Sequence, residues 1–224
     1  MSRQFSLSPR LGVCASFVRP GSVMADIGTD HALLPIWLVR EGIAASAIAS
    51  DINEGPIACA RSNISSNGMG DRIATVVADG LGGITPGQAS DIVIAGMGGD
   101  LIASILAAAP WVQDSSVRLI LQPMSHAERL REYLFTTGFA VEDEQAVIDS
   151  GRVYSVMCVH YAGSVQYDEV MLYGGLLVGR KDEASAEYLR RTALALKGKA
   201  SGLASAGNTD EAEKTLQIAE ALSE

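Results

Sequence analysis

The segment from Val23 to Pro35 constrains the fold of this chain more than any other. It reads Val-Met-Ala-Asp-Ile-Gly-Thr-Asp-His-Ala-Leu-Leu-Pro, so a short apolar run ends at an acidic residue and a glycine, and a helix-forming stretch follows. A buried parallel strand, a tight turn and a helix give this pattern, and open α/β sheets bind nucleotide-like ligands at the edge where such strands end. An ordinary strand-to-helix turn with an aspartate N-cap gives the same local pattern, so the later segments have to separate the two interpretations.

Strand and helix patterns alternate along most of the chain. Apolar runs predict strands over residues 22–27, 46–51, 73–78, 91–95 and 118–121. Apolar residues at helical spacing predict helices over residues 9–18, 34–42, 56–67, 101–108 and 126–136, with Asp100 as a cap of the fourth. Residues 139–148 and 153–161, joined by Asp149-Ser-Gly-Arg152, have the pattern of a β-hairpin. This order predicts an α/β fold with a doubly wound sheet closed by an antiparallel edge.

Beyond Gly163 the pattern becomes purely helical. Two helices are predicted at about residues 182–204 and 209–223, with a turn-rich connection between them. The apolar residues expected to face each other are Leu189, Thr192, Ala193 and Leu196 in the first helix and Leu216, Ala219 and Leu222 in the second. We therefore expect one α/β domain over residues 1–163 and an antiparallel helical hairpin over residues 164–224.

The composition excludes several classes of protein. Hydrophobic residues make up 48% of the chain and charged residues 19%, which is enough apolar material for a sizeable core. No apolar run approaches 18 residues and the N-terminus lacks a secretory signal, so we expect a soluble, cytoplasmic protein with no membrane partner. The three cysteines, Cys14, Cys59 and Cys158, are isolated, and the three histidines are scattered. This spacing predicts neither a disulfide framework nor a metal site.

Acidic residues recur where successive strands end. Asp26 and Asp51 end the first two strands, Asp79 follows the third, and Asp91 begins the fourth. A carboxylate at the end of the second strand is where a doubly wound nucleotide site accepts the ribose hydroxyls, and Asp79 could accept a proton from an adenine amino group. Each residue taken alone is equally compatible with a solvated loop carboxylate.

The first turn lacks the Gly-x-Gly-x-x-Gly motif that brings a helix N-terminus against a pyrophosphate. Asp30 stands where a glycine would be expected, and its carboxylate would repel a phosphate. S-adenosylmethionine suits such a site, because it has a ribose and an adenine, no phosphate, and a cationic sulfonium and ammonium. The segment Gly96-Met-Gly-Gly99 indicates a backbone that a ligand approaches closely, or a strained turn without a ligand.

Five segments together are similar to a known family. They are Asp26-Ile-Gly-Thr-Asp-His-Ala-Leu-Leu-Pro35, Asp51-Ile-Asn-Glu-Gly-Pro56, Asp79-Gly-Leu81, Ile94-Ala-Gly-Met-Gly-Gly-Asp-Leu-Ile102 and Leu119-Ile-Leu-Gln-Pro123. In order and spacing they resemble the bacterial tRNA (adenine-N1)-methyltransferases known as TrmK. The resemblance covers roughly residues 8–161 and extends more weakly over residues 173–177 and the helical tail. Thr29 and Leu33 depart from it, where a serine and an aromatic residue are expected.

The resemblance implies a class I, Rossmann-like fold, S-adenosylmethionine as cofactor, and methylation of N1 of the adenine at position 22 of tRNA. It implies Asp30 and His31 as the catalytic residues. Expected cofactor-binding residues are Asp26, Gly28, Asp30, Asp51, Ile52, Asp79, Gly80, Gly96 and Met97. Expected substrate-binding residues are Arg10, Met97, Gly98, Gln122 and Pro123. The product adenine is cationic, so a nearby carboxylate would stabilise the charge that develops during transfer.

The net charge of −9 complicates an RNA partner, because it repels phosphates. Basic pairs along the first tail helix, at residues 180–181, 190–191 and 197/199, could form a phosphate-contacting stripe. A solvated helix face with ion pairs such as Glu187–Arg191 explains them equally well. Arg3, Arg10 and Arg19 could add a second contact near the pocket mouth. A methyltransferase of a small molecule and a non-catalytic cofactor- and RNA-binding protein remain the alternatives, and the oligomeric state is left open.

Overall fold

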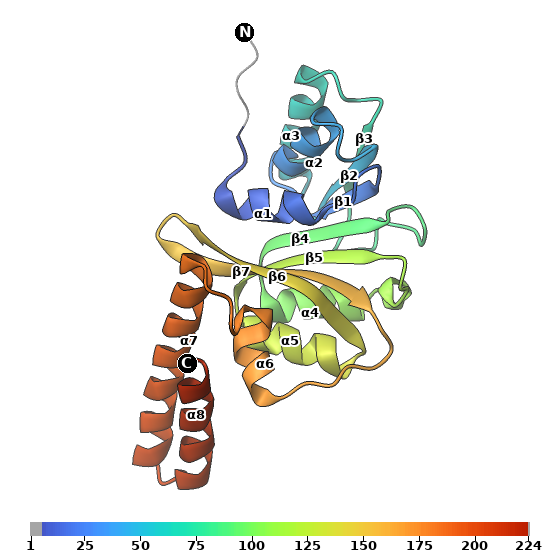
Figure 1. The fold of residues 1–224 in the computed structure, drawn as a ribbon. Coiled ribbons are helices and arrows are strands. Elements are labelled where there is room, and N and C mark those ends of the chain that lie inside the picture. The colour runs from blue at the N-terminus through green and yellow to red at the C-terminus, as the bar shows by residue number, and fades with distance from the viewer. Residues whose placement is uncertain (1–5, 224) are drawn as a thin grey trace.

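The computed structural model describes residues 6–223, and Arg3 lies outside them. Its core is a seven-stranded sheet in the order β3-β2-β1-β4-β5-β7-β6 (Figure 1). The strands are β1 (Val23–Ile27), β2 (Ser46–Asp51), β3 (Ile73–Val77), β4 (Asp91–Gly98), β5 (Arg118–Ser125), β6 (Phe139–Asp149) and β7 (Arg152–Tyr161). The first five are parallel, and β7 lies antiparallel between β5 and β6. The predicted doubly wound α/β sheet with an antiparallel hairpin edge is confirmed.

The helices cover both faces of this sheet and form a projecting hairpin (Figure 1). They are α1 (Pro9–Phe17), α2 (Leu33–Arg40), α3 (Glu54–Ser66), α4 (Gly99–Ala107), α5 (Ala127–Thr136), α6 (Glu169–Gly174), α7 (Glu183–Ser205) and α8 (Thr209–Ala221), with 3-10 turns η1 (Pro110–Val112) and η2 (Gly175–Leu177). No helix within residues 6–223 has the length and apolarity needed to cross a membrane.

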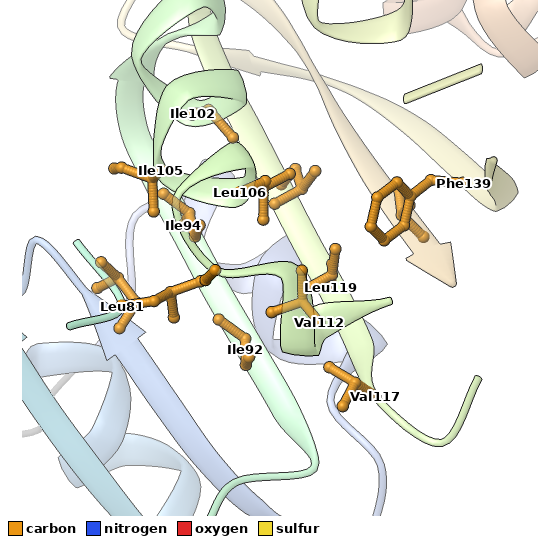
Figure 2. Close-up of a cluster of buried hydrophobic side chains, with 14 of the residues drawn as sticks. Leu81, Ile92, Ile94, Ile102, Ile105, Leu106, Val112, Val117, Leu119 and Phe139 are labelled. Atoms are coloured by element: carbon orange, nitrogen blue, oxygen red, sulfur yellow. The ribbon is translucent and has the colours of Figure 1, made fainter. Parts of the chain in front are cut away.

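Alternating residues of the central strands build a core on each face. Ile92 and Ile94 of β4 pack with α4 and α5, as Figure 2 shows for Ile102, Ile105 and Leu106. Val93 points to the opposite cluster, which contains the buried residues of α1, α2 and α3. Strands buried on both faces are expected when helices cover both sides of a parallel sheet, and this accounts for their continuous apolar runs.

Two boundaries near the ligand edge differ from the sequence prediction. β4 and β5 continue to Gly98 and Ser125, because Met97 pairs with Pro123 and Gly98 with Ser125 across an irregular register. α4 begins at Gly99 with Gly98 as N-cap, so the predicted capping role of Asp100 is wrong. The Asp100 carboxylate instead lies 3.0 Å from His126 Nδ1 and 3.4 Å from Arg129 Nη1.

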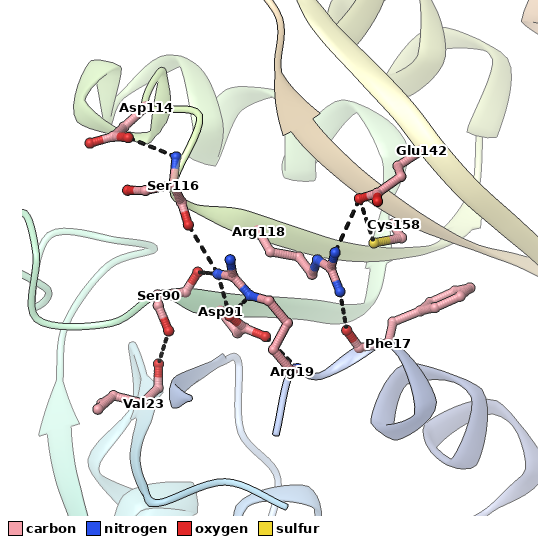
Figure 3. Close-up of polar contacts among 10 residues, drawn as sticks. All are labelled: Phe17, Arg19, Val23, Ser90, Asp91, Asp114, Ser116, Arg118, Glu142 and Cys158. Carbon is pink, nitrogen blue, oxygen red and sulfur yellow. Dashed lines mark hydrogen bonds and ion pairs between the residues drawn. The ribbon is translucent and has the colours of Figure 1, made fainter. Parts of the chain in front are cut away.

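Arg19 and Asp91 lie at the opposite edge of the sheet from the predicted site. Asp91 is fully buried at the start of β4, and its carboxylate accepts hydrogen bonds from Arg19 N at 2.7 Å and Arg19 Nε at 2.8 Å (Figure 3). The Arg19 side chain also donates to the carbonyls of Ser90 and Ser116. The expectation that Arg19 lies at a pocket mouth is therefore wrong. The Arg19–Asp91 pair holds the end of the α1 segment against the sheet.

The predicted helical hairpin is present, and a third apolar cluster holds it together. Leu189, Ala193 and Leu196 of α7 pack with Ala219 and Leu222 in this cluster, as expected. Leu216 is wrong as a facing residue, because it is 40% exposed, whereas Ala212 and Thr215 are buried. The cluster also contains Ala146 of β6, so the hairpin shares apolar contacts with the sheet. The division into domains at residues 163/164 stays a prediction.

A buried ion pair joins the sheet to the C-terminal helices. Arg131 of α5 and Glu144 of β6 are fully buried and paired with each other. Arg131 Nη1 donates to Leu172 O at 2.9 Å, and Glu144 Oε2 accepts from Leu176 N at 2.8 Å. Arg131 Nη2 lies 3.2 Å from the Tyr188 hydroxyl of α7. The pair therefore bonds to α6, to η2 and to α7.

Candidate active site

The predicted site residues gather at one edge of the sheet because of the strand register. Ile27 pairs with Ser50 on one side and with Ile94 on the other, and Ala95 pairs with Gln122. The carboxyl ends of β1, β2, β4 and β5 therefore meet, as in other open α/β sheets that bind ligands there.

The turn after β1 is held tightly against β2. The backbone N–H groups of Gly28 and Thr29 both donate to Ser50 O at 2.8 Å. Gly28 has φ of +75°, and a Cβ there would lie 2.2 Å from Met97 Cε, so the structure brings Gly28 and Met97 together. His31 and Ala32 have φ of 61° and 54°. Left-handed residues other than glycine cost energy and cluster at functional sites.

The same turn argues against the simple interpretation of this segment as a capped strand-to-helix turn. Ala32 is the N-cap of α2, and no side chain caps this helix. Asp30 is 81% exposed, and its Oδ1 lies 3.1 Å from Nε2 of His31, which is 48% exposed. Asp30 therefore does not cap the helix, and a capping role does not explain its presence in this turn.

Asp26 is a buried carboxylate with no cationic partner. It is 8% exposed, and the Thr29 hydroxyl donates to its Oδ2 at 2.6 Å. No ion pair within residues 6–223 involves Asp26. Burial raises its pKa from 3.8 to about 6, against the lowering effect of the Thr29 hydrogen bond. A cationic ligand group beside Asp26 would stabilise the ionised carboxylate and lower its pKa.

Asp26→Asn is therefore expected to stabilise the ligand-free protein at neutral pH. Because the pKa of Asp26 is higher in the folded state than in the unfolded chain, ionisation lowers the free energy of unfolding as pH rises through roughly 4 to 6. At pH 7 the free energy of unfolding of the variant should be about 3 kcal/mol higher than that of the wild type. The difference should vanish below about pH 4. Urea unfolding from pH 4 to 8 measures this, with the exposed Asp79→Asn as control. A difference independent of pH would contradict it.

Gln122 connects three parts of the edge. Its Oε1 accepts from Arg10 Nη1 at 2.6 Å and from Gly96 N at 3.1 Å, and its Nε2 donates to Pro123 O at 2.8 Å. The Gln122 side chain is fully buried, and its neighbour Pro123 is also buried. Gln122 thus holds the Gly96 turn, whose φ is +82°, and anchors Arg10 there. Direct contact of Gln122, Pro123 or Arg10 with a substrate stays a prediction.

The ends of β2 and β3 are joined in a similar way. Ala78 N donates to Asp51 O at 3.0 Å, which brings the Asp79–Gly80 turn beside Asp51. Asp51 Oδ1 accepts from Asn53 N at 2.8 Å and the side chain is half-buried. Ile52 is 58% exposed and offers an apolar surface beside it. Asp51 and Ile52 are therefore placed to contact a ligand.

The catalytic residues suggested by the resemblance lie at the rim. The His31 carbonyl accepts from Asn63 Nδ2 of α3 at 3.0 Å. No hydrogen bond or ion pair within residues 6–223 links Asp30 or His31 to Gly96, Gly98 or Gln122. Their catalytic role stays a prediction.

One candidate region was missed by the sequence analysis. A cavity of about 440 Å³ lies beyond Pro123, between the β5–α5 connection, β7 and α7. Tyr154, Tyr173 and Tyr188 line it. These residues come from three separate elements, and no local pattern in the sequence connects them.

Within residues 6–223, no group of three or more His, Cys, Asp or Glu side chains could hold a metal ion. What the fold offers is carboxylates at the ends of neighbouring parallel strands and a first turn without a phosphate-binding glycine motif. Together with the antiparallel β7, these define an α/β methyltransferase of the class I type.

Comparison with known proteins makes the assignment specific. Residues 7–157 match the methyltransferase-domain family. The chain is 40% identical to the tRNA (adenine(22)-N(1))-methyltransferase of Bacillus subtilis over 192 residues, which is 84% of this chain and 80% of that protein. The chain belongs to this family, known as TrmK.

Solved structures agree over nearly the whole chain. The crystal structure of the B. subtilis m1A22 tRNA methyltransferase TrmK has a TM-score of 0.89 at 30% identity, covering 99% of this chain and 100% of that chain. A Streptococcus pneumoniae protein, described as a candidate tRNA (m1A22) methyltransferase and solved in complex with S-adenosyl-L-methionine, has a TM-score of 0.85 at 31% identity. That match covers 98% of this chain and 100% of the other.

Proposed function

We propose that this protein transfers a methyl group from S-adenosyl-L-methionine to N1 of the adenine at position 22 of tRNA. The observation that carries the proposal is the buried Asp26 carboxylate, which has no cationic partner within residues 6–223 and lies one strand away from Asp51. Family membership supplies the tRNA substrate and the position of the adenine. A cytoplasmic location and the absence of a metal remain predictions.

The residues at the sheet edge fit the chemistry of this cofactor. When bound, the cofactor supplies a methyl group on a cationic sulfonium. Asp26 and the Gly28 turn would hold the ammonium of its methionine end, and Asp51 would accept hydrogen bonds from the ribose hydroxyls. The Asp79–Gly80 turn, with Ile105 packed under Gly80, would hold the adenine. S-adenosylmethionine has no pyrophosphate, which explains why the turn after β1 carries carboxylates rather than the glycine motif of a dinucleotide-binding fold.

Transfer requires positioning more than acid–base chemistry. Adenine N1 is neutral at pH 7, and its lone pair forms the new N–C bond as the C–S bond breaks, so no base has to remove a proton first. The adenine ring becomes cationic, and the exposed Asp30 carboxylate would stabilise that charge, with His31 oriented beside it. N1 lies on the Watson–Crick edge, so the base has to be unpaired and turned out of its stack. Met97 and Gly98 would form the wall against which it rests.

The proposal is tested by incubating unmodified tRNA with labelled S-adenosylmethionine and mapping the modified base by a reverse-transcription stop. A single stop at adenine 22 is the expected result. Methyl transfer to small molecules but not to tRNA would support the small-molecule alternative. Cofactor binding without any transfer would support the non-catalytic alternative.

Asp30→Asn is expected to lower kcat by about 100-fold while leaving the Kd for tRNA unchanged, because it removes a charge that acts only as the product cation develops. Single-turnover methylation and filter binding with the same tRNA measure the two quantities. Asp71→Asn is the matched control and should keep wild-type activity. Asp71 is exposed and precedes β3, so it lies at the amino end of the strands, away from the site. A kcat within threefold of the wild type would remove Asp30 from the mechanism.

A further inference from the structure

The basic residues of α7 are divided between two faces of the helix. Arg191 and Lys199 line the 440 Å³ cavity beside the β5–α5 connection. Arg190 and Lys197 line a different cavity of about 500 Å³, together with the residues around Arg180. The stripe expected from the sequence is therefore two separate rows, and only one of them faces the active-site edge.

The cavity on the active-site side borders the end of β5, next to the proposed methyl-transfer site. Its lining begins at Pro123, whose strand partner Met97 packs against Gly28. The lining continues along the chain from Pro123 through Met124, Ser125 and His126. A nucleotide next to the target adenine can therefore reach this cavity without a long excursion of the RNA chain.

The lining has the chemistry that binds unpaired nucleotides. Tyr154, Tyr173 and Tyr188 are half-buried and line the cavity, with Arg131 over the Tyr188 ring at 5.7 Å from its centroid, and the volume is within the range of small-ligand sites. Aromatic side chains combined with cations are the usual platform for single-stranded nucleic acid. Lys199 takes part in no ion pair within residues 6–223, and Arg191 shares Glu187 with Arg190. Both cations are exposed, and a phosphate would contact Arg191 beside its ion pair with Glu187.

An acidic region limits where the RNA can run. Lys199 and Glu128 also border a smaller cavity of about 250 Å³, whose lining includes Glu132, Glu169 and Glu211. Four glutamates outnumber Lys199 and Lys214 in that lining, so an RNA backbone that contacts Lys199 is favoured to leave the 440 Å³ cavity on the Arg191 side.

We propose that the cavity between α7 and the β5–α5 connection binds an unpaired nucleobase that neighbours the target adenine, with the adjoining phosphates on Arg191 and Lys199. Holding this second base unstacked would keep the target base turned out. The inference rests on the proposed tRNA methylation and names the RNA subsite next to it.

The test compares two double variants of the same helix. Arg191→Gln/Lys199→Gln removes the row facing the active-site edge, and Arg190→Gln/Lys197→Gln removes the other row. Each double variant removes two positive charges. One is an arginine that pairs with Glu187, and the other is a lysine that has no ion pair within residues 6–223, so the two variants are matched. The first should raise the Kd for tRNA about tenfold and lower its salt slope by about 1 to 2, whereas the second should change the Kd by less than about twofold.

A second pair of variants tests the stacking. Tyr154 is chosen because no hydrogen bond within residues 6–223 uses its hydroxyl, whereas Tyr188 contacts Arg131. Tyr154→Phe should keep the wild-type KM for tRNA, and Tyr154→Ala should raise it about tenfold with little change in the Kd for S-adenosylmethionine.

The outcomes separate this inference from the proposed function. Equal losses from both double variants, or a loss confined to Arg190/Lys197, would overturn the subsite, as would an unchanged KM in Tyr154→Ala. Wild-type protein that binds tRNA but never methylates it would refute the proposed function. The comparison of Kd values between the two rows would then still decide whether this face binds RNA.

Discussion

Arg131→Ala is expected to lower the free energy of unfolding by about 3 to 5 kcal/mol. The substitution leaves the Glu144 carboxylate buried with Leu176 N as a remaining donor, and it frees the carbonyls of Leu172 and Tyr173 from their side-chain donor. A buried charge without its partner is among the most destabilising changes a core can suffer. Urea unfolding monitored by far-UV circular dichroism measures the effect.

Arg180→Ala is the matched control, because Arg180 pairs with Asp143, the residue next to Glu144, but both side chains are partly exposed. Exposed ion pairs contribute little, so the control should change the free energy of unfolding by less than about 1 kcal/mol. Arg131→Met combined with Glu144→Leu should recover much of the lost stability, since an apolar pair leaves no unpaired charge. A loss below about 1 kcal/mol in Arg131→Ala would show that the pair is not needed.

Asp51→Ala is expected to raise the Kd for S-adenosylmethionine by about 100-fold. The ribose diol would lose two hydrogen bonds to a charged acceptor, each worth about 1.5 to 3 kcal/mol, part of which water recovers. The fold should persist, because the Asp51 carboxylate accepts one structural hydrogen bond, from Asn53 N, at an exposed turn. Isothermal titration calorimetry with the cofactor measures the change.

Asp71→Ala, again at the amino end of the strands, should leave this Kd unchanged and controls for the loss of one negative charge from an acidic protein. An Asp51→Ala protein that unfolds normally and still binds the cofactor within threefold of wild type would contradict the proposed ribose contact. The Kd of Asp51→Asn for the cofactor should lie between those of the wild type and Asp51→Ala, because an amide oxygen is a weaker hydrogen-bond acceptor than a carboxylate.

Asp51 and Arg131 lie in different parts of the fold. Asp51 acts at the edge where the strands end, whereas Arg131 bonds to the segments that lead to α7. Tyr188 takes part in the Arg131 network through its hydroxyl and also lines the 440 Å³ cavity. The position of α7 is therefore held by a buried ion pair as well as by the apolar contacts of the hairpin.

Much of the fold followed from local patterns in the sequence. Apolar runs with glycine turns located all seven strands, and helical spacing located α1 to α5, α7 and α8, because each pattern depends on residues close together in the chain. The short helix α6, which Asp168 caps, was not predicted, since its few residues show no clear period. The continuation of β4 to Gly98 was missed because it depends on pairing with Pro123 and Ser125.

The sequence by itself determined that Asp26, Gly28, Asp51 and Gly96 lie where strands end, and it predicted them as ligand-binding residues from the family motifs. Only the tertiary structure decided which residues lie together there. It removed Arg19 from the pocket mouth by pairing it with Asp91, buried Gln122 as a link between Arg10 and Gly96, and divided the basic residues of α7 between two faces. The reason is physical: motifs report short-range backbone geometry, whereas burial, ion pairing and the facing of a helix depend on residues that only folding brings together.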